Sequence, residues 1–157
     1  LNKKIGLIGA GGSARALITG LAEAGASQIL IYNRTLERAE KLKSDFSKIF
    51  PTIKIKSVSL DDIKEAHLDL LVNSSSVGMK PNESPIDLKL FKKIEHIVDI
   101  IYNPAQTKLI KKALELGIPN INGLGMLLYQ GCEAFKFWTD QNAPESTMQK
   151  QLLNLVK

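Results

Sequence analysis

Residues 3–16 read KKIGLIGAGGSARA, and this stretch decides the fold. Its first part, residues 3–8, is a short apolar run of the kind that forms a buried β-strand. A glycine-rich turn follows at residues 9–12, and residues 13–24 then carry apolar side chains at helical spacing. A strand, a glycine-rich turn and a helix in this order form the first half of a βαβ unit.

The rest of the chain repeats this alternation. Further strands are expected at residues 28–32, 53–58, 70–73, 97–100 and 118–121, with helices at 35–49, 60–66 and 107–116. After Gly125 the pattern is helical only, at about residues 126–138 and 144–156. The sequence therefore predicts an α/β fold: a Rossmann-like, doubly wound parallel sheet with helices on both faces and two C-terminal helices, in one domain over residues 1–157.

Composition limits the classes of function. No apolar run has the length of a membrane span and no signal peptide is recognisable, so a soluble, cytoplasmic chain is expected. The single cysteine, Cys132, cannot form an internal disulfide, which fits a reducing compartment. The net charge of +5 comes from lysines spread along the chain without a dense run, which favours small anionic ligands over nucleic acid. No metal site is predicted, and His67 and His96 are interpreted as ordinary surface or edge residues.

The glycine-rich turn gives the first functional signal. Gly9 permits a tight turn, Gly11 lets the backbone approach a pyrophosphate, and a small residue at Ala14 or Ala16 lets the helix lie close to the strand. A pyrophosphate would then bind the backbone N–H groups at the helix N-terminus. The predicted pyrophosphate-binding residues are Gly9, Ala10, Gly11, Gly12, Ser13 and Ala14. The alternative is a strand-to-helix turn that binds nothing.

The residues after the second strand select the dinucleotide. About twenty residues beyond the glycines, an Asp or Glu would bind the ribose hydroxyls of NAD. This chain has Asn33, Arg34 and Thr35 there, and Arg38 one turn into the next helix. Arg34 can bind a 2′-phosphate through two parallel hydrogen bonds, whereas a carboxylate would repel it. The predicted cofactor is therefore NADP. In the alternative interpretation, Arg34 and Arg38 merely solvate the start of a helix.

Four further motifs follow in order. They are NSSSVGM at residues 73–79 with Pro81 and Ser84-Pro85; DIIYNP at 99–104 with Thr107; NGLGML at 122–127; and Gln130-Gly131 with Ala134-Phe135 and Trp138-Thr139. Together with the glycine-rich turn and the arginine cluster, this set resembles the shikimate dehydrogenase family. The resemblance is specifically to its C-terminal NADP-binding domain, and it spans residues 3 to about 140.

The resemblance implies roles for individual residues. The residues implied to hold the 2′-phosphate are Asn33, Arg34, Thr35 and Arg38. The loop implied to run under the nicotinamide ribose consists of Asn73, Ser74, Ser75 and Ser76. The nicotinamide-contacting positions are Gly123 and Met126, with Ile100 or Ile101 nearby, and the substrate-contacting positions are Tyr102 and Gln130. Ligands of open α/β sheets bind at the carboxyl ends of strands, and three of these segments follow predicted strands. The alternatives are that Met126 is helix core, Gln130 caps a buried group and Tyr102 belongs to a plain turn.

The resemblance also implies what this chain lacks. Reduction of a ketone needs a proton donor beside the carbonyl. In the family this is a lysine paired with an aspartate in an N-terminal substrate domain, which is expected to precede Leu1. No catalytic residue is therefore predicted within this chain. The isolated chain is expected to bind NADP(H) without turnover, and the full-length protein to reduce 3-dehydroshikimate to shikimate reversibly with NADPH.

Other readings of the function stay open. Quinate dehydrogenases resemble the same family, and a non-catalytic NADP-binding or sensor module would need the same cofactor residues. Glutamyl-tRNA reductases share the cofactor domain, but the block at residues 122–138 argues against them. The last helix is expected to pack on the absent domain, and its exposed apolar side would favour a homodimer of the isolated chain.

Overall fold

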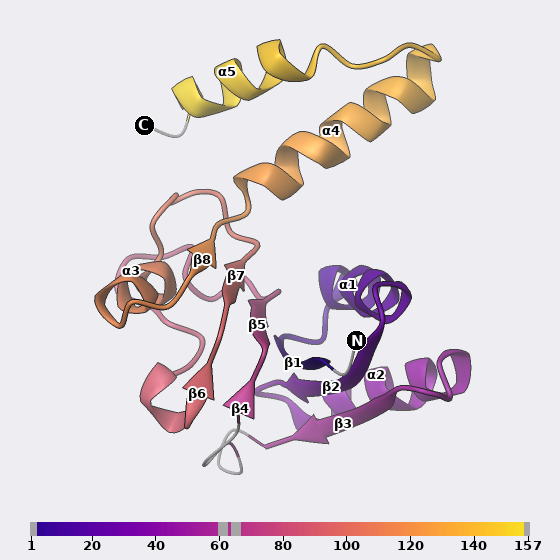
Figure 1. The fold of residues 1–157 in the computed structure, drawn as a ribbon, viewed down its shortest axis with the longest axis vertical. Helices are drawn as coiled ribbons and strands as arrows, with labels where there is room; N and C mark the ends of the chain where they lie inside the picture. The colour runs from indigo at the N-terminus through magenta and orange to yellow at the C-terminus, as the bar shows by residue number, and fades with distance from the viewer. Residues whose placement is uncertain (1–2, 60–62, 64–66, 156–157) are drawn as a thin grey trace.

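The computed structural model describes residues 3–59, 63 and 67–155 (Figure 1). Within these residues, the main sheet has six parallel strands in the order β3-β2-β1-β5-β7-β8. They are β1 (Lys3–Ile8), β2 (Ala26–Tyr32), β3 (Lys54–Val58), β5 (Leu70–Asn73), β7 (Ile97–Asp99) and β8 (Asn120–Ile121). The order reverses direction at β1, and the crevice at such a reversal is where open α/β sheets bind ligands. The predicted doubly wound parallel sheet is confirmed.

Two helices cover one face of the sheet, α1 (Gly12–Glu23) and α2 (Leu36–Ile49). Alternate residues of β2, Ile29 and Ile31, are fully buried in the same apolar cluster as Ile18 of α1. On α2 the buried residues are Ala39, Leu42 and Phe46, which recur at helical spacing. The buried side chains at alternate positions of β2 and those at helical spacing on α2 therefore belong to the same apolar layer.

The opposite face is covered by α3 (Lys108–Glu115) and by the segment that contains η2 (Leu88–Leu90). The other alternate residues of β2, Leu30 and Tyr32, point into this second cluster together with Leu109 of α3. Helical structure therefore lies on both faces of the sheet, as predicted. The helix expected at residues 60–66 falls almost entirely outside the described residues.

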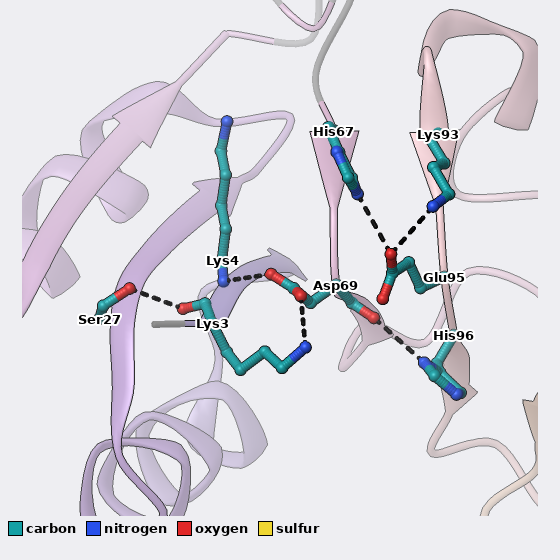
Figure 2. Close-up of polar contacts among 8 residues, drawn as sticks. All are labelled: Lys3, Lys4, Ser27, His67, Asp69, Lys93, Glu95 and His96. Atoms are coloured by element: carbon teal, nitrogen blue, oxygen red, sulfur yellow. Dashed lines mark hydrogen bonds and ion pairs between the residues drawn. The ribbon is translucent and has the colours of Figure 1, made fainter. Parts of the chain in front are cut away.

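A small second sheet lies at the amino ends of β5 and β7, formed by β4 (His67–Leu68) and β6 (Lys93–Ile94) (Figure 2). Asp69 separates β4 from β5. Its carboxylate accepts hydrogen bonds from the backbone N–H of Lys4 and from Lys3 Nζ, each at 2.7 Å. These contacts tie the start of β1 to the start of β5.

The two histidines also lie in this small polar group. Both are exposed, as expected, yet each has a partner. His67 Nε2 lies 3.5 Å from Glu95 Oε1, which also binds Lys93 Nζ at 3.0 Å. His96 Nδ1 lies 3.4 Å from the carbonyl oxygen of Asp69 (Figure 2).

The two C-terminal helices are present as predicted, α4 (Leu124–Thr139) and α5 (Glu145–Leu155). Figure 1 shows α4 extending away from the sheet and α5 running back beside α4. They meet where Cys132 Sγ lies 4.0 Å from Met148 Sδ. Leu128 is the one buried residue of α4, whereas Trp138 is 79% exposed. In the described part of the chain, no helix has both the length and the apolar character to cross a membrane.

Candidate functional site

The glycine-rich turn joins β1 to α1 and contains glycines of two kinds. Gly9 has φ +105°, and a Cβ there would lie 2.9 Å from Ser74 Oγ, so the fold itself requires glycine. A Cβ at Gly11 or Gly12 would meet nothing within 4 Å, and the backbone of Gly11 is ordinary and extended. Protein packing therefore gives no reason for glycine at these two positions, whereas a ligand approaching the backbone closely would.

The N-terminus of α1 faces the same space. No side chain caps this fully described helix, and its first turn has no acidic residue. Arg15 N donates to Gly11 O at 3.2 Å, so the N–H groups that precede it have no partner inside the helix. Free N–H groups and the positive end of the helix dipole form an anion site, so a diphosphate fits here. Ala14, in the first turn of α1, is fully buried in the apolar cluster that the helix forms with β1 and β2.

The end of β2 presents two unpaired cations. Arg34 and Arg38 are exposed, and neither guanidinium forms an ion pair with any residue that the structure describes. The Thr35 hydroxyl does not cap α2, and Asn33 Nδ2 donates to Thr35 O at 2.7 Å, which closes the turn. Arg15, by contrast, binds Asp45 at 3.0 Å. The two guanidinium groups are therefore free to bind an anion.

A cavity of about 520 Å³ opens at the carboxyl ends of β5 and β7, beside the start of α4. Its lining residues are Ser13, Ser74, Ser75, Ser76, Met79, Ile100, Ile101, Tyr102, Asn103, Gly123, Met126, Leu127 and Gln130. The structure thus brings the predicted serine loop, nicotinamide positions and substrate positions to one cavity. The glycine-rich turn and the arginine cluster lie beside it at the same edge of the sheet, because β1, β2 and β5 end in register.

Three lining residues were missed by the sequence reasoning, Met79, Asn103 and Leu127. All three belong to the motifs that carry the family resemblance, so the motifs themselves were the available signal. Asn73 was predicted among the cofactor residues, but its side chain is fully buried beneath the cavity and holds the loop from below.

A buried polar network lies beneath the residues that line the cavity. Asp99, at the end of β7, is fully buried and accepts hydrogen bonds from Asn73 Nδ2 at 3.0 Å, Ile101 N at 3.2 Å and Thr107 Oγ1 at 2.6 Å. Burial raises the pKa of Asp99 above its ordinary value, and the hydrogen bond from Thr107 is the largest effect in the opposite direction. Ser74 Oγ donates to Ile8 O at 2.7 Å and so connects the neighbouring strand ends.

The start of α4 closes the cavity on the other side. Gly123 N donates to Ile101 O at 3.0 Å, and a Cβ on Gly123 would overlap the carbonyl oxygen of Ile100. Only glycine allows the two backbones to pass this closely. The side chains of Tyr102, Met126 and Gln130 line the cavity and remain partly open to solvent.

A second, larger cavity of about 1100 Å³ lies between residues 77–89 and α3. None of the predicted site residues lines it. The predicted nicotinamide and substrate positions therefore line the smaller of these two cavities and not the larger one.

Two family models match parts of this chain. The family model described as Shikimate / quinate 5-dehydrogenase matches residues 1–81, and that described as Shikimate 5'-dehydrogenase C-terminal domain matches residues 123–153. A shikimate dehydrogenase (NADP(+)) from Methanopyrus kandleri is 37% identical, over 96% of this chain and 54% of the relative. The chain therefore spans about half the length of the curated relatives that it matches.

Solved structures show the same fold. Shikimate 5-dehydrogenase from Thermus thermophilus, in complex with NADP(H) and shikimate, has a TM-score of 0.83 and 32% identity, over 98% of this chain and 55% of that one. Quinate dehydrogenase from Corynebacterium glutamicum, in complex with NAD, has a TM-score of 0.87 and 25% identity, over 98% and 56%. Since one family model matches more than half of the residues, the chain belongs to the shikimate/quinate 5-dehydrogenase family.

Proposed function

We propose that this chain is the NADP(H)-binding domain of a shikimate dehydrogenase, which reduces 3-dehydroshikimate to shikimate reversibly with NADPH. One observation carries the proposal. An uncapped helix N-terminus with open space at Gly11 and Gly12 lies at the same sheet edge as the unpaired Arg34 and Arg38. The positive helix end complements the negative charge of a pyrophosphate, and the two guanidinium groups complement that of a 2′-phosphate.

The remaining contacts follow the order of the strands. The adenosine 2′-phosphate binds Arg34 and Arg38, and the pyrophosphate binds the backbone of the glycine-rich turn. The nicotinamide end enters the 520 Å³ cavity, where Met126 and Gly123 contact it. Tyr102 and Gln130 lie at the open side of the cavity and contact the substrate. When bound, the cofactor supplies the hydride, and this chain's residues bind and orient the reactants.

The whole protein needs a second domain for the chemistry. The lysine and aspartate that transfer the proton in this family belong to an N-terminal substrate domain, so we assign them to that part of the parent protein. The last helix, α5, would pack on that domain, and in the isolated chain its exposed apolar side, which includes Leu153, would favour a homodimer. Catalysis would take place in the cytoplasm, and the isolated chain would bind the cofactor without turnover.

Quinate is the second candidate substrate, since the quinate dehydrogenase from Corynebacterium glutamicum shares this fold. That protein was solved in complex with NAD. The free guanidinium groups of Arg34 and Arg38 favour the phosphorylated cofactor in this chain, which makes the NADP-dependent shikimate reaction the better match.

Titration of the chain with NADPH and with NADH, read by nicotinamide fluorescence, tests the proposal. Arg34→Ala removes a charge-assisted hydrogen bond from the 2′-phosphate, so the Kd for NADPH should rise about tenfold or more while that for NADH changes less than about twofold. Lys43→Ala is the matched control, because Lys43 is an exposed cation of α2 that already binds Glu40 at 3.0 Å. Equal losses for both cofactors in Arg34→Ala would contradict the assignment of NADP.

A further inference from the structure

Two segments contribute much of the lining of the 520 Å³ cavity, residues 73–77 after β5, through residues 74–76, and residues 99–107 after β7, through residues 100–103. The two strands pair directly, with Asn73 opposite Asp99. Beyond this pair the loops leave the sheet, so backbone hydrogen bonding between the strands no longer fixes their separation. Side chains must fix it instead.

Asp99 connects both loops through a single carboxylate. Oδ1 accepts hydrogen bonds from Asn73 Nδ2 at 3.0 Å and from Ile101 N at 3.2 Å, while Oδ2 accepts one from Thr107 Oγ1 at 2.6 Å. All these contacts are buried, and no cation pairs with this carboxylate among the described residues. A buried carboxylate is costly unless donors surround it, which makes this geometry hard to rearrange.

The two side-chain partners of Asp99 each shape one loop. Asn73 Nδ2 also donates to Val77 O at 3.2 Å, and Asn73 Oδ1 accepts hydrogen bonds from Ser75 N at 3.1 Å and Ser75 Oγ at 2.7 Å. Thr107 Oγ1 also accepts from Ile110 N at 3.2 Å, which caps α3. The orientation of the serine loop and that of the segment carrying Tyr102 therefore depend on the same buried group.

We infer that Asp99, Asn73 and Thr107, here named the Asp99 latch, position the nicotinamide half of the site without touching the cofactor. This inference rests on the proposed function. The latch lies at the ends of β5 and β7, whereas the residues assigned to the adenosine 2′-phosphate follow β2, on the other side of β1. The latch should therefore affect one half of a bound dinucleotide and leave the other half unchanged.

Two ligands separate these halves. Adenosine 2′,5′-bisphosphate carries the 2′-phosphate but no nicotinamide, and NADPH carries both. In Asp99→Asn, one oxygen that accepts a hydrogen bond becomes an amide that cannot accept one. Because a mispaired buried group costs at least as much as one hydrogen bond, the Kd for NADPH should rise about tenfold, while that for adenosine 2′,5′-bisphosphate should change less than about twofold.

Thr107 provides a milder pair of variants if Asp99→Asn folds poorly. Thr107→Val removes the hydroxyl that donates to Asp99, while Thr107→Ser keeps it. Thr107→Val should weaken NADPH binding by about tenfold and Thr107→Ser should restore affinity to within about twofold of the unmodified chain. Equal affinities for NADPH in the two variants would overturn the latch.

Asp69→Asn is the matched control for both, because Asp69 also accepts a backbone N–H and a side-chain hydrogen bond, but at the amino end of β5, where it binds the start of β1 (Figure 2). Its ratio of the two Kd values should equal that of the unmodified chain, measured by calorimetric titration of folded protein. If Asp99→Asn weakens the binding of both ligands by the same factor, the inference about the latch is wrong, while the proposed function still holds. An unmodified chain that binds neither ligand would overturn the proposed function, and the latch with it.

Discussion

The two edges of the parallel sheet carry polar groups of different kinds. At the amino edge, Lys3 and Asp69 form an exposed ion pair, and Lys93 and Glu95 form another (Figure 2). At the carboxyl edge, Asp99 is fully buried and bound to neutral donors. Water competes with the first kind of contact and is excluded from the second. Exposed ion pairs contribute little to stability, whereas buried polar groups hold a fixed geometry once all partners are present.

The glycines at the carboxyl edge also differ from a glycine elsewhere in the fold. Those of the carboxyl edge are required by a close approach or a left-handed backbone, as at Gly123 and Gly9, or leave space open, as at Gly11. Gly20, on the exposed side of α1, also has open space around it, but it lies in the last turn of the helix, away from the strand ends. Substitutions at the carboxyl edge should therefore affect folding or binding strongly, and substitutions elsewhere should not.

The largest effect is expected for Gly123→Ala. Its Cβ would overlap the carbonyl oxygen of Ile100, so the start of α4 must move, at a cost of about 3 kcal/mol in the free energy of unfolding. Urea denaturation measures it. Gly20→Ala is the control and should be neutral or stabilise the chain by up to about 1 kcal/mol, since its Cβ meets open space in a helix. Similar changes in the free energy of unfolding for the two substitutions would contradict the special role of glycine at the carboxyl edge.

Gly11→Ala should separate binding from stability. The added Cβ meets nothing within 4 Å in the protein, so the urea midpoint should stay nearly unchanged. It would occupy space next to the proposed pyrophosphate, so the Kd for NADPH should rise about tenfold or more. Fluorescence titration and urea denaturation of the same preparation provide the two readouts. An unchanged Kd for NADPH would contradict the assignment of the pyrophosphate to this turn.

Asp69→Asn should have a small effect that depends on pH. The hydrogen bond from Lys3, followed by that from the Lys4 backbone, lowers the pKa of Asp69 below its ordinary value of 3.8. A lowered pKa contributes stability above the ordinary value, and this contribution is lost as the pH falls through the lowered one. The substitution should cost less than about 1 kcal/mol at neutral pH and make the acid limb of the stability profile less steep. If thermal melts show the same loss of stability at acid pH in the variant and the unmodified chain, Asp69 does not make this contribution.

The smallest effect at neutral pH is expected for Tyr32→Phe. The Tyr32 hydroxyl is buried, and no atom of the described residues hydrogen-bonds to it, so its removal should change the free energy of unfolding by less than about 1 kcal/mol. Burial raises the pKa of Tyr32 to about 12 from its ordinary 10.0. Its contribution to stability is thus complete below pH 10 and is lost as the pH rises between the two values. The variant should lose less stability over this range in alkaline melts.

Much of the fold follows from local sequence patterns. The apolar run at residues 3–8, the glycines after it and the spacing of Ala39, Leu42 and Phe46 act within one element, so periodicity predicts them. β8 begins two residues later than predicted, because Ile118 N donates to Ala113 O and closes the end of α3. β4 and β6 were missed since two-residue strands have no period, and Asp69 contacts Lys4 from 65 residues away.

The candidate site was also predictable only in part. Motifs predicted the serine loop, Tyr102 and Gln130, and the structure brings them to one cavity. They did not predict that Asn73 lies beneath it, or that Asp99 joins Asn73 to Thr107. Such contacts depend on the register of β5 and β7, which a single sequence does not specify.

Trp138 gives the C-terminal helices a built-in optical reporter. Its indole is 79% exposed near the end of α4, and the chain has no other tryptophan. Its emission should lie at long wavelength and be quenched readily by iodide. Any surface that comes to cover α4 would shift this emission to the blue and protect it from the quencher, so the assembly state of these helices can be followed without an attached dye.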